Sequence, residues 1–229
     1  IIKQKFPSCK IYGSDIGYMH SGKLFADRLT IFPRADRKIE YIKKLNSYIQ
    51  KNKIDLFIPT SESEILLFDK YKKKIKINKF ICPSTKLILI GSDKYKTYQY
   101  LKSLGIQTPW TYQTKDLKKS IKFPCLVKGK HGRGSKNLFT CNNSEEAKFF
   151  SKYFKNGIFQ EILVPKEKEI TCAIYRFKNK EIKILQLLRS LKDGYTVWSK
   201  VVKNKNIETL CRNLTKKINF YGPANFQLI

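Results

Sequence analysis

The sequence has few of the residues from which metal sites and disulfide frameworks are built. Its 229 residues include two histidines, one methionine and six cysteines. No two cysteines form a Cys-x-x-Cys motif, and together with the histidines they match no zinc spacing. We therefore expect free thiols in a reducing compartment. The cysteines are Cys9, Cys82, Cys125, Cys141, Cys172 and Cys211.

Long apolar runs are lacking as well. The longest clean run is about four residues, near residues 87–90, whereas a membrane-spanning helix needs roughly 18 to 20. Residues 1–5 have neither the apolar core nor the small-residue cleavage site of a signal peptide. We expect a cytoplasmic protein with no membrane partner.

Acidic residues are scarce relative to basic ones. The chain has 18 Asp and Glu against 47 Lys and Arg, a formal net charge of +29. Such a surplus ordinarily favours a nucleic acid or an anionic membrane as partner. However, 40 of the 47 cations are lysine and only seven are arginine, the residue with which proteins usually read bases and grip phosphates. A solvated basic surface with no specific nucleic acid is therefore favoured, and a nucleic-acid surface stays as the alternative.

Apolar and aromatic residues are present in sufficient number to form a core. They make up 41% and 13% of the chain, which excludes a disordered protein and predicts one large domain or two small ones.

The first 105 residues alternate short apolar runs with segments of helical periodicity. This order predicts a parallel sheet. The predicted strands are residues 10–16, 54–59 and 80–82. Three helices are predicted. The first follows Asp36 as its cap and turns Ile39, Ile42, Leu45, Tyr48 and Ile49 inward, and the second follows the capping box Ser61–Glu64 and turns Ile65, Leu66 and Phe68 inward. The third begins at Asp93 and ends at Gly105.

After Gly105 the period changes and short strands follow one another closely. This pattern predicts an antiparallel sheet with a helix inserted in it. The predicted strands are residues 109–114, 124–128, 137–141, 158–163, 170–177, 182–190 and 224–229, and the predicted helices are 144–154 and 207–220.

Residues 123–137 carry the strongest single indication of chemistry. A strand places Lys128 before a loop that contains Gly129, Gly132 and Gly134. Glycines let backbone N–H groups approach a polyphosphate closely, although a glycine-rich hairpin turn explains the same pattern without a ligand. The segment is not a Walker loop, which requires Gly-Lys-Ser/Thr leading into a helix.

Four segments, read in order, resemble the ATP-grasp superfamily in its carbamoyl-phosphate-synthase-like, carboxylate-amine ligase branch. With the β-α segments that precede them, they extend the resemblance over nearly the whole chain. The four are residues 91–97 with Leu101, Gly105 and Pro109; residues 123–137; residues 158–162 with 169–171; and residues 222–227, Gly-Pro-Ala-Asn-Phe-Gln.

The resemblance implies an α/β chain, α+β overall, with two domains. Residues 1–88 would form a partial, doubly wound parallel-sheet pre-ATP-grasp domain. Residues 89–229 would form an ATP-grasp domain of antiparallel sheets and helices, with residues 108–165 as its small lid subdomain. Because the family has a strand and glycine-rich turn before the strand at 10–16, and a Glu-x-Asn segment after residues 222–227, we expect both ends to be incomplete.

The resemblance also implies how ATP would be bound. Lys94 and Lys128 would contact the α- and β-phosphates, since ammonium groups neutralise phosphate charge. The backbone of residues 129–136, with Gly132, Gly134 and Ser135, would cover the β- and γ-phosphates as a mobile lid.

Adenosine would lie along the next matching segment. Gln160, Glu161, Ile162 and Leu163 would border the adenine, because a strand edge offers the donors and acceptors of a base pair. Glu169 would accept hydrogen bonds from the ribose hydroxyls.

Two further residues are implied, and two depart from the family pattern. Arg189 would be catalytic, meeting the transferred phosphate or a substrate carboxylate, although an ion pair or surface role explains it as well. Gln227 would lie near a Mg²⁺ site. Gly129 replaces the usual proline and Arg133 places a bulky cation in the loop, so both are expected to alter loop closure.

The implied activity is that of an ATP-dependent ligase. ATP phosphorylates a small carboxylate to an acyl phosphate, which an amine or ammonia then attacks; the expected cofactors are ATP and Mg²⁺, and a homodimer is compatible with the resemblance. The alternatives are a nucleotide-binding scaffold without turnover and a basic module for RNA or an acidic partner. In that module Tyr95, Tyr98 and Tyr100 would stack on bases between lysines.

Overall fold

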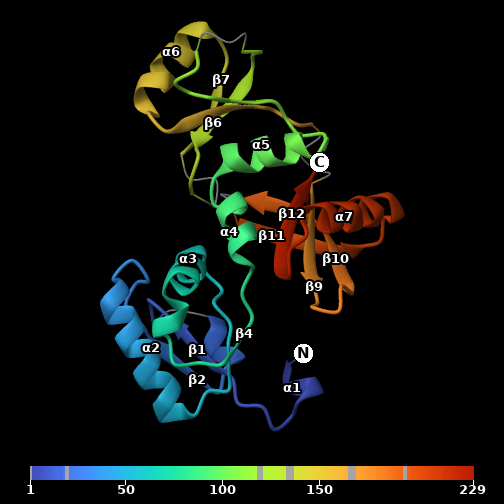
Figure 1. Ribbon diagram of the computed structural model, residues 1–229. Coiled ribbons are helices and arrows are strands. Elements are labelled where there is room, and N and C mark those ends of the chain that lie inside the picture. The colour runs from blue at the N-terminus through green and yellow to red at the C-terminus, as the bar shows by residue number, and fades with distance from the viewer. Residues whose placement is uncertain (1, 19–20, 118–120, 133–136, 165–168, 193–194) are drawn as a thin grey trace. The chain divides into compact units, whose positions relative to one another are not determined.

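The computed structural model describes residues 2–18, 21–117, 121–132, 137–164, 169–192 and 195–229 (Figure 1). Its contacts divide the chain into two compact units, residues 1–82 and 83–229. The boundary that the family resemblance implies lies after residue 88. The helix that spans this point belongs to the second unit, because Leu87 and Ile90 pack in that unit's core.

The first unit alternates short strands with helices, as its sequence pattern predicts. Strands β1 and β2 pair in parallel, and so do β3 and β4, which confirms the parallel arrangement; among the described residues the four strands form two two-stranded sheets and not one continuous sheet. The strand β2 was not predicted. The elements are α1 (Ile2–Lys5), β1 (Tyr12–Asp15), the 3-10 turn η1 (Ser21–Leu24), β2 (Arg28–Ile31), α2 (Lys38–Asn52), β3 (Leu56–Phe57), α3 (Glu62–Tyr71), the 3-10 turn η2 (Lys72–Lys74) and β4 (Lys79–Phe80).

The apolar side of α2 differs from the predicted stripe at its first turn. Tyr41, Leu45 and Ile49, at a spacing of four, are buried. Ile39 is 86% exposed, because the first turn extends beyond the core. Asp36 does not cap the helix, since the N-cap residue is Arg37 and the Asp36 carboxylate pairs with Arg34.

The start of α3 forms the predicted capping box. The Ser61 hydroxyl accepts from the Glu64 N–H at 3.2 Å, and the Glu64 carboxylate accepts from the Ser61 N–H at 3.0 Å. The same carboxylate accepts from the Tyr41 hydroxyl at 2.6 Å, which ties α2 to α3. Leu67 and Phe68 face inward, whereas the predicted Leu66 is 41% exposed.

The second unit contains two four-stranded antiparallel sheets instead of the single sheet that the pattern suggested (Figure 1). The strand orders are β5-β8-β6-β7 and β11-β10-β9-β12. Neither α4 nor β11 was predicted. The elements are α4 (Thr85–Gly91), α5 (Lys94–Ser103), β5 (Thr111–Gln113), β6 (Cys125–Gly129), β7 (Leu138–Cys141), α6 (Ser144–Tyr153), β8 (Gly157–Glu161), β9 (Ile170–Arg176), β10 (Ile182–Lys192), β11 (Tyr195–Val202), α7 (Lys205–Ile218) and β12 (Gly222–Leu228).

The smaller sheet packs one face against α6. Val127 and Phe159, neighbours on β6 and β8, lie in this core with Ala147 of α6. Gly157, at the start of β8, leaves no room for a side chain: a Cβ there would lie 2.7 Å from the Cβ of Phe154 and 2.9 Å from Thr114. In the ladder, Gly157 stands opposite Gly129.

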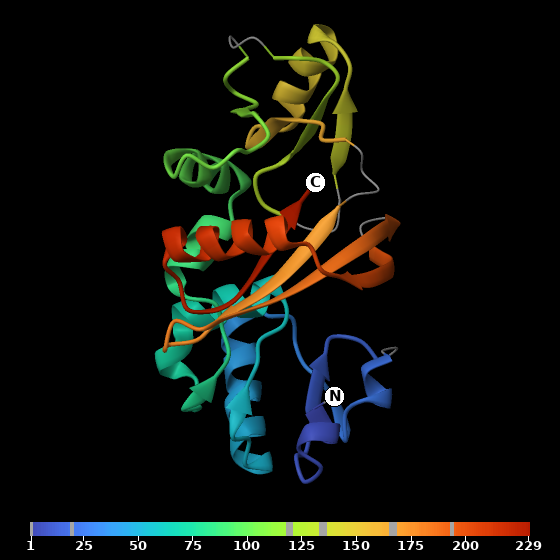
Figure 2. The same cartoon turned by 90° about the vertical axis from the view of Figure 1, so that its right-hand side faces the viewer.

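The larger sheet packs one face against α7, which runs along it in Figure 2. Cys172 and Ile174 of β9 meet Leu214 and Ile218 of α7 in this core. Arg176, buried at the end of β9, donates to the Thr215 and Phe220 carbonyls, both at 3.3 Å, and to the Asn219 side chain at 3.0 Å, and so satisfies the end of α7.

The cysteines are free thiols, as expected. Cys125 faces Cys141 across two strands, and burial, with a smaller effect of Cys141, raises the pKa of the Cys125 thiol to about 12. Burial raises the pKa of Cys211, which lies beside Cys172, to about 12 as well. Within the residues that the structure describes, no helix has both the length and the apolar character needed to cross a bilayer.

The capping box gives a first prediction. Replacing Ser61 by alanine removes the acceptor for the Glu64 N–H, so we expect Ser61→Ala to lower the free energy of unfolding by about 1 kcal/mol. Chemical denaturation measures it. The matched control is Ser63→Ala, an exposed serine in the same turn, for which a change within about 0.5 kcal/mol is expected. Equal losses in both variants would contradict the prediction.

Candidate functional site

The candidate site lies where β6 ends and α5 begins. Strand β6 carries Lys128 and leads into residues 129–132, while the first helical residue of α5 is Lys94. Asp93 caps this helix, its carboxylate accepting from the Tyr95 N–H at 2.8 Å and the Lys96 N–H at 3.1 Å. The structure therefore brings Lys94 and Lys128, two predicted phosphate ligands, together.

Lys128 lies on the face of the smaller sheet that points away from α6. It stands opposite Ile158 and alternates with the buried Val127. Burial and, secondly, the charge of Lys94 lower the pKa of the Lys128 ammonium to about 8. Among the described residues its side chain has no hydrogen-bond or ion-pair partner. Two neighbouring cations, one of them poorly solvated, attract an anion.

Lys94 is held by the loop that follows β6. Its ammonium donates to the Gly132 carbonyl at 2.7 Å and more weakly to the Lys130 carbonyl at 3.4 Å. Its backbone N–H donates to the same Lys130 carbonyl at 3.0 Å. Gly132, a predicted cofactor-binding residue with a φ of +110°, therefore contacts the second lysine of the site.

Two side chains that were not predicted fix the same loop. His131 Nδ1 lies 2.7 Å from the Ser92 carbonyl, and Nε2 lies 3.9 Å from the Asp93 carboxylate. The Lys130 ammonium donates to the Gln113 side chain and lies 5.7 Å from the centre of the Tyr95 ring. These contacts join residues far apart in the chain, so no local sequence pattern predicts them. Gly134 and Ser135, also predicted to contact phosphate, lie outside the described residues.

Part of the predicted adenine segment belongs to strand β8 of the smaller sheet. Gln160 is paired in the ladder with both β5 and β6, and its side chain donates to Thr111 at 3.0 Å. Glu161 accepts from the Trp110 N–H at 3.1 Å. Ile162 and Leu163 follow the end of β8, outside the ladder, so they are the part of the segment that is not used by the sheet.

Glu169 and Arg189, predicted to serve ribose and catalysis, bind each other. Arg189 Nε donates to the Glu169 carboxylate at 2.9 Å, and one terminal guanidinium nitrogen donates to the same oxygen. Their side chains are only 19% and 16% exposed. The ion pair that the sequence left open as an alternative is therefore present, and it joins the start of β9 to β10.

Gln227 lies on β12 with its side chain exposed. It stands in a cross-strand row with Thr171 and Leu187, on the sheet face away from α7. Arg189 lies two residues beyond Leu187 on that face. No group of three His, Cys, Asp or Glu side chains able to hold a metal occurs in the part of the chain that the structure describes.

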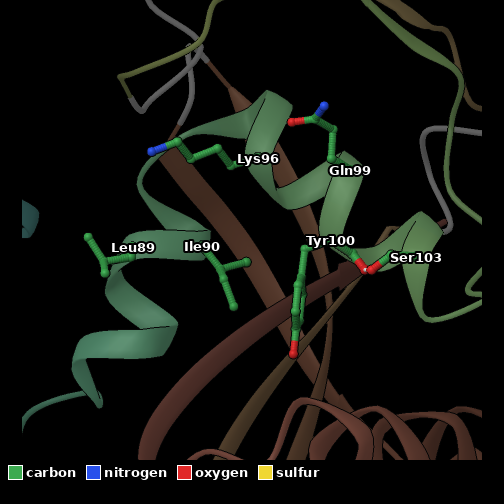
Figure 3. Close-up of a pocket in the computed structure, with 6 residues that line it drawn as sticks. All are labelled: Leu89, Ile90, Lys96, Gln99, Tyr100 and Ser103. Atoms are coloured by element: carbon green, nitrogen blue, oxygen red, sulfur yellow. The ribbon is translucent and has the colours of Figure 1, made fainter.

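A separate hollow lies between α4 and α5, with a volume of about 450 Å³ (Figure 3). None of the residues predicted to bind ATP or Mg²⁺ borders it. Its apolar wall includes the Tyr100 ring, which points downward in Figure 3 while Gln99 points the opposite way. The lining residues are Leu89, Ile90, Lys96, Gln99, Tyr100 and Ser103.

The tyrosines proposed for base stacking are engaged inside the molecule. Tyr95 and Tyr98 are half-buried, their ring centres 6.0 Å apart, and a lysine ammonium lies over each ring. Tyr100 packs on the core of the larger sheet. These contacts do not favour the nucleic-acid alternative.

Comparisons with known proteins show the family and the fold. The family model described as ATP-grasp domain matches residues 91–225. A D-alanine–D-alanine ligase of Fusobacterium nucleatum is 36% identical over 78 residues, which are 34% of this chain and 26% of the ligase.

Two solved structures share the fold. N5-carboxyaminoimidazole ribonucleotide synthetase of Thermus thermophilus is 13% identical with a TM-score of 0.72, over 99% of this chain and 62% of that one. The biotin carboxylase domain of the Hydrogenobacter thermophilus 2-oxoglutarate carboxylase, in complex with MgADP and bicarbonate, is 18% identical with a TM-score of 0.70, over 97% and 56%. The chain thus spans less than two thirds of these proteins.

The paired lysines give a prediction that needs no ligand. We expect Lys128 to titrate near pH 8, and Lys94→Gln to raise that pKa without restoring the ordinary 10.5, because burial is the larger cause. NMR titration of the lysine ε-carbons measures it. The control Lys96→Gln changes an exposed lysine of the same helix and should leave the value unchanged. A Lys128 pKa near 10.5 in the unaltered chain would contradict the burial of its ammonium, and a value that Lys94→Gln leaves unchanged would show that the two ammonium groups are not close.

Proposed function

Because this chain belongs to the ATP-grasp superfamily, we propose that it binds Mg²⁺-ATP and serves an ATP-dependent ligase that activates a small carboxylate for attack by an amine or ammonia. The observation that carries the proposal is the pair of neighbouring ammonium groups of Lys94 and Lys128 beside residues 129–132. This pair lies inside the region matched by the family model.

The phosphate chain of ATP would lie between the two lysines. Lys128 is short of solvent and of protein acceptors among the described residues, so a phosphate oxygen would gain a charge-assisted hydrogen bond there. Lys94, fixed by two carbonyls, would supply the second cation. Residues 129–132 would lie over the phosphates, as part of the lid subdomain proposed for residues 108–165.

The adenosine would lie between the end of β8 and the start of β9. Ile162 and Leu163 would offer their backbone groups to the adenine edge beyond Gln160 and Glu161. Glu169 would accept hydrogen bonds from the ribose hydroxyls. Arg189 would either keep its ion pair and hold that carboxylate in position, or release it and contact the transferred phosphate.

Magnesium would be held mostly by the nucleotide. The Gln227 side chain offers one amide oxygen, which suits an ion that takes most of its ligands from phosphates and water. It does not by itself make a protein-held metal site. Bound there, Mg²⁺ would neutralise charge on the phosphate oxygens.

The proposed reaction proceeds in two balanced steps. A carboxylate oxygen attacks the γ-phosphorus of ATP and ADP leaves; the amine then attacks the carbonyl carbon of the acyl phosphate, and inorganic phosphate leaves with loss of one proton. The chain's residues contribute by orienting the phosphates and stabilising their charge. The acyl phosphate hydrolyses in water, which gives a covering loop a chemical purpose.

Calorimetry with Mg²⁺-ATP tests the proposal. We expect binding, and an affinity lower by roughly tenfold or more in Lys128→Ala, because a lysine–phosphate contact contributes about 1.5 to 3 kcal/mol. The matched control is Lys152→Ala, an exposed lysine on α6 that should leave the affinity unchanged. Absence of ATP binding by the unaltered, folded chain would refute the proposed function.

The basic surface gives a contrasting prediction. Scattered lysines release counterions without reading bases, so RNA of any sequence should bind weakly and lose affinity steeply between about 50 and 200 mM salt. Fluorescence anisotropy with two unrelated RNAs of equal length measures this. A complex that is selective for one sequence and survives at high salt would favour the binding-module alternative over the ligase.

A further inference from the structure

We propose that His131 is a positioning residue that fastens residues 129–132 to the junction of α4 and α5 and so keeps the Lys94 ammonium beside that of Lys128. The proposal rests on the proposed function, in which these two lysines bind phosphate. His131 itself would not touch the nucleotide.

The His131 ring lies against both residues of the junction. Ser92 is the C-cap residue of α4 and Asp93 is the N-cap residue of α5. Nδ1 is 2.7 Å from the Ser92 carbonyl, so the tautomer that protonates Nδ1 donates a hydrogen bond there. Nε2 faces the Asp93 carboxylate at 3.9 Å. One side chain thus links the loop to the end of one helix and the start of the next.

The loop residues on either side of His131 contact Lys94. The Lys130 carbonyl accepts from the Lys94 N–H at 3.0 Å, and the Gly132 carbonyl accepts from the Lys94 ammonium at 2.7 Å. His131 stands between these two carbonyls in the chain. Its attachment to Ser92 therefore fixes the part of the loop that holds Lys94.

This attachment matters because the two ammonium groups repel each other. The ladder of β6 with β7 and β8 fixes the backbone of Lys128, and burial limits the movement of its side chain, whereas the Lys94 side chain begins the first turn of α5 and is only half-buried. The loop carbonyls offset the repulsion and keep Lys94 in place. If the loop leaves the junction, Lys94 loses these acceptors and moves away from Lys128.

The test compares His131→Ala with His131→Asn. Asparagine keeps a donor near the position of Nδ1, so it should retain the Ser92 contact while alanine removes it. In His131→Ala we expect the affinity for Mg²⁺-ATP to fall about fivefold, and the pKa of Lys128 to rise, because Lys94 no longer lies beside it. In His131→Asn both values should stay near those of the unaltered chain.

A double variant shows whether His131 acts through Lys94 or through another charged group nearby. Asp93, Lys94 and Lys130 lie around His131, and only Lys94 is among the causes of the low Lys128 pKa. His131→Ala should therefore change little when Lys94 is already glutamine. An equal fall in affinity in that background would show that His131 acts directly or by general destabilisation, and would overturn the proposal.

The Lys128 titration also separates this proposal from the proposed function. It is measured without nucleotide, so it reports on His131 even if the chain binds no ATP. A Lys128 pKa that is the same in His131→Ala and in the unaltered chain would overturn the positioning role by itself.

Discussion

The repulsion between the ammonium groups of Lys94 and Lys128 is the constraint on which the candidate site depends. One group stands on a strand of the smaller sheet and the other on the first turn of α5. They remain close because one is buried on the ladder and loop carbonyls hold the other. An anion between them relieves the repulsion, so the electrostatic part of the binding free energy is most favourable for the ligand with the greatest negative charge.

The backbone on which Lys128 stands depends in turn on a very small residue. Gly157 lies opposite Gly129, where Phe154 and Thr114 leave no space for a methyl group. Thr114, fully buried, donates to the Phe154 carbonyl at 2.6 Å and accepts from the Gly157 N–H at 3.1 Å. The exit of β6 toward the loop is therefore fixed by packing beneath it as well as by the loop's own contacts.

Elements governed by neighbours in the chain could be predicted, and elements governed by distant neighbours could not. The capping box at Ser61 and the start of α5 at Asp93 follow from local hydrogen bonds. Ile39 fits the helical period yet is exposed, because the period does not reveal where the core ends. In the site, motif order predicted Lys94 and Lys128 together, whereas the contact of His131 with Ser92 depends on the folded loop.

The burial of the thiols has a practical consequence for chemical labelling. Thiolates are the reactive species, and burial keeps Cys125 and Cys211 protonated far above neutral pH. Cys141 and Cys172 are buried as well, and burial raises the pKa of the half-buried Cys82 to about 11, while Cys9 is exposed. A maleimide dye added at neutral pH would therefore attach first at Cys9, which places a single reporter on the first unit of the native chain, without any engineered substitution.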